Sequence, residues 1–167
     1  FLVKITEEVA YQTDVQPGDL LFWFADLGWI MGPWEVVGAT ALGATVFLFD
    51  GAPNHPGPDR LWSMVERHAI THLGVSPTLV RALIPSGEEP VRSHDLSSLR
   101  ILASTGEPWN PDPYRWFFEE VGKAELRRRD EHVRRLTLRE HRGQGGARRR
   151  SIHGGCISHY WRSSLMF

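Results

Sequence analysis

Residues 20–49 read LLFWFADLGWIMGPWEVVGATALGATVFLF. The two ends of this stretch, 20–24 and 45–49, are apolar, rich in β-forming residues and bounded by turn residues, so each predicts a short buried strand. Between them, segment 33–42 begins with a proline and is followed by Gly43, which is typical of a helix from its first turn to its end. A strand, a helix and a second strand in this order predict a βαβ unit with parallel strands.

The alternation of strands and helices continues on both sides of this unit. Ser76 followed by Pro77 is typical of a helix N-cap with a proline in the first turn. Further helices are expected over 1–13, 61–68, 77–83 and 111–121, and further strands over 71–75 and 99–103. We therefore expect an α/β fold built on a doubly wound, largely parallel sheet with flanking helices.

Charge divides the chain near Leu126. Residues 1–126 carry eight Lys and Arg against 17 Asp and Glu, whereas residues 127–167 carry 11 Lys and Arg against three Asp and Glu. Their net charges are therefore −9 and +8, although the whole chain has −1. We expect 127–167 to be an irregular, Arg-rich tail, either disordered or out of frame, since a shifted reading of GC-rich DNA yields such sequence. Sequencing the coding DNA tests that hypothesis.

Composition excludes several classes of protein. The single cysteine, Cys156, permits no internal disulfide and no thiolate metal site, and it fits a reducing, cytoplasmic compartment. No apolar run reaches the roughly 18 residues that a membrane helix needs. The chain begins at Phe1 without a methionine and in the middle of a pattern, so we expect a fragment whose N-terminus lies upstream.

Three loops follow predicted strands at their carboxyl ends, at 26–32, 50–54 and 104–108. Each combines glycine with polar groups, and in open α/β sheets ligands bind beside the carboxyl ends of the strands. One such loop alone is also what a plain connection between a strand and a helix looks like. The three together, in this order and spacing, predict a ligand site.

Several short motifs resemble one family in their order and spacing. They are Asp26-Leu27-Gly28-Trp29, Gly43-Ala44-Thr45, Asp50-Gly51-Ala52-Pro53-Asn54, Ser76-Pro77-Thr78, Arg81-Ala82-Leu83, Asp95-Leu96-Ser97-Ser98-Leu99-Arg100, Gly106-Glu107-Pro108 and Asn110-Pro111. Together they resemble the AMP-forming acyl-CoA synthetases of the adenylate-forming superfamily, in an acetyl-CoA synthetase-like form. The resemblance implies that residues 1–126 are the central part of that family's large N-terminal domain.

The resemblance implies a ligase reaction in two steps. A carboxylate attacks the α-phosphate of ATP to give an acyl-adenylate and pyrophosphate, and the thiol of coenzyme A then attacks the acyl carbon. Anions meet in both steps, so the whole enzyme supplies Mg²⁺, which enters with ATP, and cationic side chains. The expected partners are a short, acetate-like carboxylic acid, ATP and coenzyme A, with no membrane and with nucleic acid disfavoured.

The resemblance also implies roles for individual residues. It assigns adenine binding to Gly106, Glu107 and Pro108, the acyl pocket to Trp29, Ile30, Met31 and Thr105, and coenzyme A binding to Met31 and Asn54. Two positions depart from the acetate-specific members, which tend to have threonine in place of Met31 and valine in place of Thr105. The size of the acid therefore stays open.

Much of the family's catalytic apparatus is missing from the sequence. The phosphate loop should precede Phe1, and the strand whose glutamate serves Mg²⁺ should follow Gly122, where the Arg-rich tail stands instead. No residue of the chain is an obvious general base, nucleophile or metal ligand. We therefore expect the chain alone to be inactive.

Two other functions stay open at this stage. The Arg-rich tail could bind nucleic acid, although no aromatic residues interleave its arginines between Arg127 and Arg150. Ser76, at a strand-to-helix junction, could be a hydrolase nucleophile, although Thr78 stands where that motif needs glycine. His68 and His72 are four residues apart, but a predicted helix end between them speaks against a metal pair.

Overall fold

A four-stranded parallel sheet forms the centre of the molecule in a computed structural model, which describes residues 1–122. The strands are β1 (Leu20–Trp23), β2 (Thr45–Val46), β3 (His72–Val75) and β4 (Ile101–Ser104), in the order β2-β1-β3-β4. All three strand pairs are parallel, with Leu21 beside both Val46 and His72. The predicted α/β fold with a parallel sheet is confirmed.

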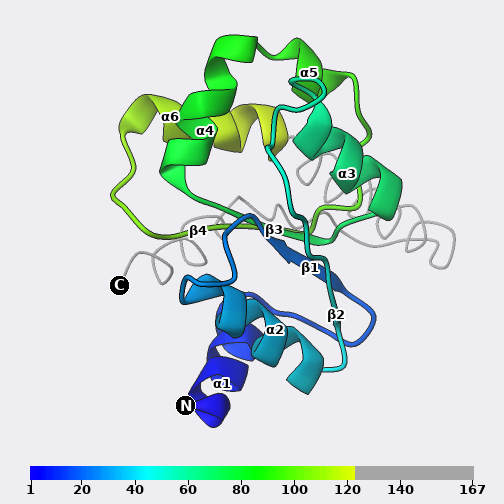
Figure 1. The fold of residues 1–167 in the computed structure, drawn as a ribbon, viewed down its shortest axis with the longest axis vertical. Coiled ribbons are helices and arrows are strands. Elements are labelled where there is room, and N and C mark those ends of the chain that lie inside the picture. Colours follow the sequence, from blue (N-terminus) through cyan, green and yellow to red (C-terminus); the bar gives the residue numbers. More distant parts are fainter. Residues whose placement is uncertain (123–167) are drawn as a thin grey trace, which may run out of the picture.

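Helices cover both faces of the sheet (Figure 1). Helices α1 (Leu2–Gln12) and α2 (Met31–Ala41) lie on one face, and α3 (Arg60–His68), α4 (Pro77–Leu83), α5 (Glu89–Arg92) and α6 (Pro111–Trp116) lie on the other. A 3₁₀ turn, Ile84–Ser86, follows α4, and a π-helical stretch, Phe117–Val121, continues α6. This two-sided arrangement is the doubly wound one that the sequence predicts.

The sheet separates two hydrophobic cores, because alternate residues of a strand point to opposite faces. Leu21 and Trp23 of β1 pack with α1 and α2, whereas Phe22 packs with the helices of the other face. Val9 of α1 is fully buried in the first core, and Trp62 of α3 is almost fully buried in the second. Both faces of β1 are therefore covered, as its unbroken apolar sequence indicates.

Strand β2 is much shorter than the sequence predicts. A strand was expected over 45–49, but β2 ends at Val46, and the Leu48 side chain is 54% exposed. The backbone N–H of Phe47 still donates to the Leu21 carbonyl at 2.8 Å. The Trp23 N–H would be the next donor from β1 to the edge strand β2, but it donates to the Glu35 side chain at 2.7 Å. The hydrogen bonding between β1 and β2 therefore stops there.

Other boundaries differ by smaller amounts. The helix expected over 33–42 begins at Met31, and the strand expected over 99–103 begins at Ile101 and ends at Ser104. The helix expected over 111–121 is α-helical only to Trp116. The 3₁₀ turn and α5 were not predicted, because their sequence around Pro85 and Pro90 shows no helical period.

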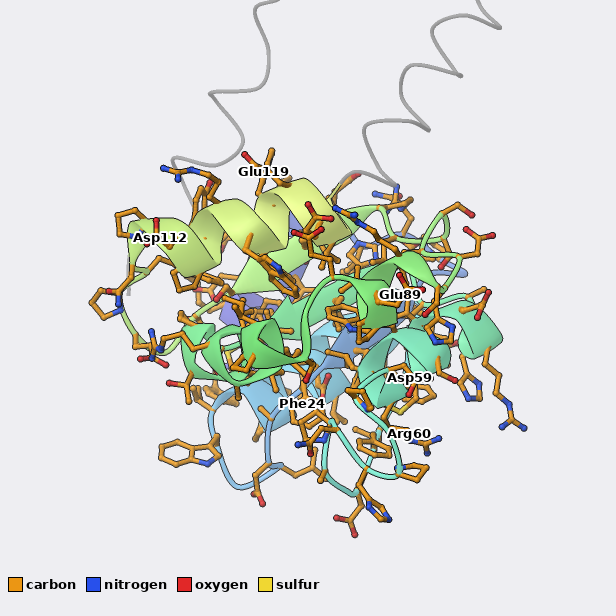
Figure 2. The ribbon with its side chains drawn as sticks, turned by 90° about the horizontal axis from the view of Figure 1, so that it is seen from above. Phe24, Asp59, Arg60, Glu89, Asp112 and Glu119 are labelled. Atoms are coloured by element: carbon orange, nitrogen blue, oxygen red, sulfur yellow. The ribbon has the colours of Figure 1, made fainter. Side chains whose placement is uncertain are left out.

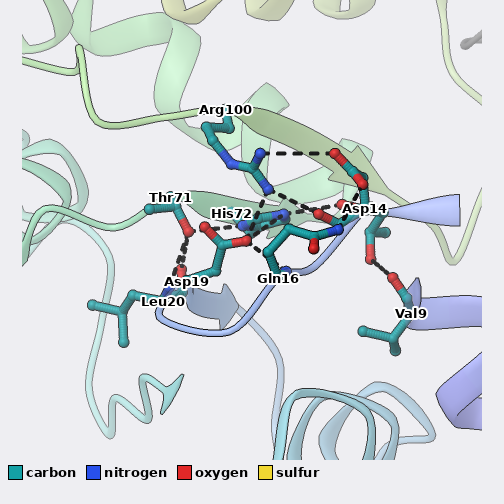
Figure 3. Close-up of polar contacts among 9 residues, drawn as sticks. Val9, Asp14, Gln16, Asp19, Leu20, Thr71, His72 and Arg100 are labelled. Carbon is teal, nitrogen blue, oxygen red and sulfur yellow. Dashed lines mark hydrogen bonds and ion pairs between the residues drawn. The ribbon is translucent and has the colours of Figure 1, made fainter. Parts of the chain in front are cut away.

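A buried polar network fastens the amino ends of the strands (Figure 3). Arg100 pairs with Asp19 at 2.8 Å, and both precede strands. His72 is 1% exposed, and its two ring nitrogens contact the Thr13 carbonyl at 2.9 Å and the Thr71 hydroxyl at 2.8 Å. Since a carbonyl only accepts, Nε2 carries the proton, and burial lowers the pKa of His72 and keeps the ring neutral.

The surface over α3–α6 carries both acidic and arginine side chains. Glu89, Asp112 and Glu119 are exposed there (Figure 2). None of the helices in residues 1–122 is long and apolar enough to span a membrane.

Candidate functional site

A pocket of about 610 Å³ opens where the carboxyl ends of β1, β3 and β4 meet the amino end of α2. Its walls combine α1, the loop between β1 and α2, and the loop after β4. The lining residues are Glu8, Gln12, Thr13, Trp23, Phe24, Ala25, Asp26, Trp29, Ile30, Met31, Trp34, Ser76, Ala103, Ser104, Thr105 and Gly106. The pocket lies at the edge of the sheet where ligands bind in doubly wound folds.

The loop between β1 and α2 is held at its start and at its end. The Asp26 carboxylate accepts the Gly28 N–H at 2.6 Å, which closes a tight turn before Trp29. The Glu35 side chain, one turn into α2, accepts the Trp23 N–H at the end of β1 at 2.7 Å. This bond joins the residue before the loop to the helix after it, so it fixes the wall that Trp29 and Met31 form.

Glu35 is a carboxyl group in an apolar environment. The residue is 1% exposed and lies between the sheet and α2. Burial raises the pKa of Glu35 to about 7, and the hydrogen bond from the Trp23 backbone opposes this rise only in part. The group therefore exchanges its proton near neutral pH, directly behind the pocket wall.

Two tryptophan rings form the floor of the pocket. Trp23 and Trp34 meet edge to face, with ring centroids 5.3 Å apart. The Trp23 ring lies across β3 at Gly74, where a Cβ atom would come within 2.2 Å of the indole. The Trp34 indole N–H donates to Glu8 of α1 at 3.3 Å. Glycine on β3 thus makes room for the Trp23 ring, which packs edge to face with Trp34.

The loop after β4 is anchored through Glu107. One carboxylate oxygen accepts the Thr78 N–H at 2.9 Å and the Thr78 hydroxyl, and the other accepts from Arg81 at 2.5 Å. The bonds from the Thr78 side chain and from Arg81 lower the pKa of Glu107. Gly106 has φ +106°, a conformation that side chains rarely adopt, and no atom lies within 4 Å of a Cβ built there. The hydrogen bonds of Glu107 therefore hold the loop in place, and the main chain at Gly106 is left uncovered.

The structure brings together most of the residues that the sequence assigned to a site. Trp29, Ile30, Met31 and Thr105 line the same pocket, and so does Gly106. Glu107 and Pro108 lie beyond the lining of this pocket, and the Glu107 side chain turns toward α4. Asn54 is exposed on the loop before α3 and also lies outside the pocket. Its role in coenzyme A binding stays a prediction.

Sequence reasoning missed Ser104 and the aromatic floor. The Ser104 hydroxyl is buried and has no hydrogen-bond partner in the part of the chain that the structure describes. The sequence feature that could have identified Ser104 is its position at the end of an apolar strand, directly before a glycine-containing loop. Trp34 follows Met31 by three residues, a spacing that puts both on one face of a helix.

The alternative roles of Ser76 and the histidines find little support. The Ser76 hydroxyl accepts the Leu79 N–H at 3.1 Å, so Ser76 caps α4 as predicted. His72 is occupied in the strand network, and His68 contacts the Phe47 ring. No group of three or more His, Cys, Asp or Glu in residues 1–122 could hold a metal ion. The nucleic-acid reading concerns residues 127–167, which lie outside the described part.

Comparison with known proteins agrees with this geometry. The chain is 44% identical over 124 residues to the acetyl-coenzyme A synthetase of Chlorobaculum tepidum, which covers 74% of this chain and 19% of that protein. It is 44% identical over 113 residues to the acetyl-coenzyme A synthetase of Drosophila melanogaster, covering 67% of this chain and 17% of the relative. The chain thus spans about a fifth of the length of the curated relatives it matches.

A solved structure and a family model extend the comparison. The acetoacetyl-CoA synthetase from Streptomyces lividans superposes with a TM-score of 0.67 at 36% sequence identity, covering 73% of this chain and 19% of that one. The model of the AMP-binding enzyme family matches residues 2–128, which include all of the pocket residues. On this match the chain belongs to the AMP-binding enzyme family, whose acyl-CoA synthetase members it resembles in sequence and in fold.

Proposed function

We propose that this chain is part of an AMP-forming ligase that activates a small carboxylic acid with ATP and transfers the acyl group to coenzyme A. The observation that carries the proposal is the meeting of two loops, 29–31 and 105–106, in one pocket at the carboxyl ends of the strands. The family match and the acetyl and acetoacetyl groups in the names of the relatives support it.

In this proposal the two loops have different partners. The main chain at Gly106 faces the adenine ring, because the anchored Glu107 holds the loop and the glycine leaves its face bare. Trp29, Ile30, Met31 and Thr105 surround the acyl group, while Met31 and Asn54 lie along the path of coenzyme A. The described side chains supply orientation and exclude water, and the proposal gives none of them a proton-transfer step.

Mg²⁺ belongs to the proposal as the companion of ATP. No cluster of acidic or histidine side chains in residues 1–122 fits a metal ion. No contact with Mg²⁺ is proposed for the described residues. We further propose that 1–126 is the central part of the large N-terminal domain, that 127–167 is a separate basic tail, and that the enzyme is cytoplasmic.

A titration of the 167-residue chain with AMP tests the proposal. In ¹⁵N-resolved NMR spectra, millimolar AMP should shift the backbone amides of Thr105, Gly106 and Glu107, and leave that of Asp112 in place as an internal control. ATP–pyrophosphate exchange by the same sample should stay at background. Unmoved loop amides would contradict the adenine-facing role, and exchange above background would contradict the inactivity of the chain alone.

A further inference from the structure

Trp109 lies in the loop after β4, and its side chain packs on α6 and on the π-helical stretch that continues α6. The Trp109 ring stacks on the Phe117 ring, with the centroids 6.0 Å apart and the two planes inclined by 18°. It also meets the Tyr114 ring edge to face, with the centroids 5.8 Å apart. Aromatic rings prefer both arrangements, so the indole has a defined position. Phe117 is itself buried in the core, which makes it a fixed support.

The loop is therefore attached at two points to one layer of helices. Glu107 accepts hydrogen bonds from Thr78 and Arg81 of α4, and Trp109 packs on α6 two residues later. Helices α4 and α6 are in contact on the same face of the sheet (Figure 1). Residues two apart in an extended stretch point to the same side. Burial follows this rule, because Glu107 and Trp109 are half-buried and Pro108 between them is exposed.

The two attachments enclose the residues to which the proposed function assigns the nucleotide. Gly106 lies between Ser104, the last residue of β4, and Glu107. Pro108 lies between Glu107 and Trp109. Because proline has no N–H to donate, Pro108 cannot be held by a backbone donor of its own. Its position therefore depends on the side chains that are anchored on both sides of it.

We infer that Trp109 is a positioning residue of the proposed ligase: it stacks on Phe117 and, together with Glu107, holds the main chain from Gly106 to Pro108 where the adenine nucleotide binds. This inference rests on the proposed function and adds a residue to it. Trp109 acts through the loop and is given no contact with the nucleotide. A loop that is already fixed loses little further freedom when a ligand binds, so removing the ring contacts should weaken binding.

The test removes the ring and keeps an apolar side chain at the same position. Trp109→Leu loses both aromatic contacts, whereas Trp109→Phe keeps a ring that can stack on Phe117. Trp116→Leu is the matched control, because Trp116 lies on α6 and packs against the same core but stands outside the loop. Each substitution is made in the whole 167-residue chain.

Two NMR measurements are compared among these chains. The backbone order parameters of Gly106 and Glu107 should be near about 0.85 in the unsubstituted chain and fall below about 0.6 in Trp109→Leu. The affinity for AMP should fall about three- to tenfold in Trp109→Leu, since the loop must then be ordered on binding. Trp109→Phe and Trp116→Leu should stay within about twofold of the unsubstituted affinity, even where thermal unfolding shows that Trp116→Leu is less stable.

The outcomes separate the positioning role from general packing and from the ligase proposal. Order parameters or an AMP affinity that Trp109→Leu leaves unchanged would overturn the positioning role. An equal loss of affinity in Trp116→Leu would also overturn it, because the effect would then be one of core packing, and so would a failure of Trp109→Phe to retain binding. If the unsubstituted chain does not bind AMP, the ligase proposal itself fails.

Discussion

Replacing Glu35 with glutamine should make the stability of the chain less sensitive to a rise in pH from 5 to 8. The substitution keeps the shape of the side chain and an oxygen that can accept the Trp23 N–H, but it removes the ionisable group. Glu35 is 1% exposed, and burial raises its pKa from 4.5 to about 7. In the unfolded chain the same carboxyl loses its proton near pH 4.5, so folding becomes coupled to proton uptake.

The sign and size follow from this difference in pKa. A group whose pKa is raised by folding contributes its stabilisation fully below the unfolded value and loses it as the pH rises through the folded value. Between pH 5 and pH 8, a rise from 4.5 to about 7 corresponds to a loss of about 2–3 kcal/mol from the free energy of unfolding. The glutamine variant does not undergo this loss.

Urea unfolding followed by tryptophan fluorescence at pH 5, 6.5 and 8 measures the effect. The quantity to compare is the stability of Glu35→Gln minus that of the unsubstituted chain, which should rise by about 2–3 kcal/mol from pH 5 to pH 8. Any constant contribution of the new amide cancels in this double difference, as do other titrating groups. A difference that is the same at all three pH values would refute the reasoning, and a fall would show that the fold favours the carboxylate.

Three further predictions concern neighbouring groups. In a chain that carries both Glu35→Gln and His94→Gln, stability should fall as the pH drops from 7 to 5, because burial lowers the pKa of His72 and the unfolded chain then binds more protons; the second substitution removes His94, whose raised pKa acts in the opposite direction, and the same urea series checks this. Gly74→Ala should destabilise the chain by about 3 kcal/mol in urea unfolding at constant pH, since the new methyl group meets the Trp23 ring at 2.2 Å. Glu107→Ala should weaken AMP binding severalfold in the NMR titration by releasing the loop from α4, and an unchanged affinity would remove Glu107 from its positioning role.

The order of elements could be predicted because each one is signalled locally. The apolar runs of β1 and β3, the cap at Ser76 and the glycine that ends α2 all act within a few residues of themselves. The extent of β2 could not be predicted in this way. It depends on which group accepts the hydrogen bond of the Trp23 N–H. The acceptor is the side chain of Glu35, twelve residues away on α2. Sequence patterns do not register such a competition between a strand and a helix.

The positions of the loops that form the site could be predicted from the sequence, but the directions of their side chains and the residues at the bottom of the pocket could not. Loop positions follow from the rule that ligands bind at the carboxyl ends of parallel strands, and five of the assigned residues line one pocket. The direction of a loop side chain follows from tertiary partners instead. Glu107 turns to Arg81 and Thr78 on α4, and a sequence gives no sign that a charged loop residue pairs with a neighbouring helix. The floor likewise needs Gly74 to lie beneath Trp23 on the neighbouring strand.

Both walls of the pocket are therefore set by a glutamate that points away from the proposed ligand. Glu35 joins α2 to the end of β1 and fixes the acyl wall, and Glu107 joins the loop after β4 to α4 and fixes the nucleotide wall. Their surroundings are opposite: burial raises the pKa of Glu35 to about 7, while bonds from Thr78 and Arg81 lower the pKa of Glu107. A rise in pH through neutrality consequently places a charge behind the acyl wall and leaves the charge of the nucleotide wall unchanged. It follows that binding of the acyl group should depend on pH near 7, whereas binding of adenosine, which has no group that ionises in this range, should not.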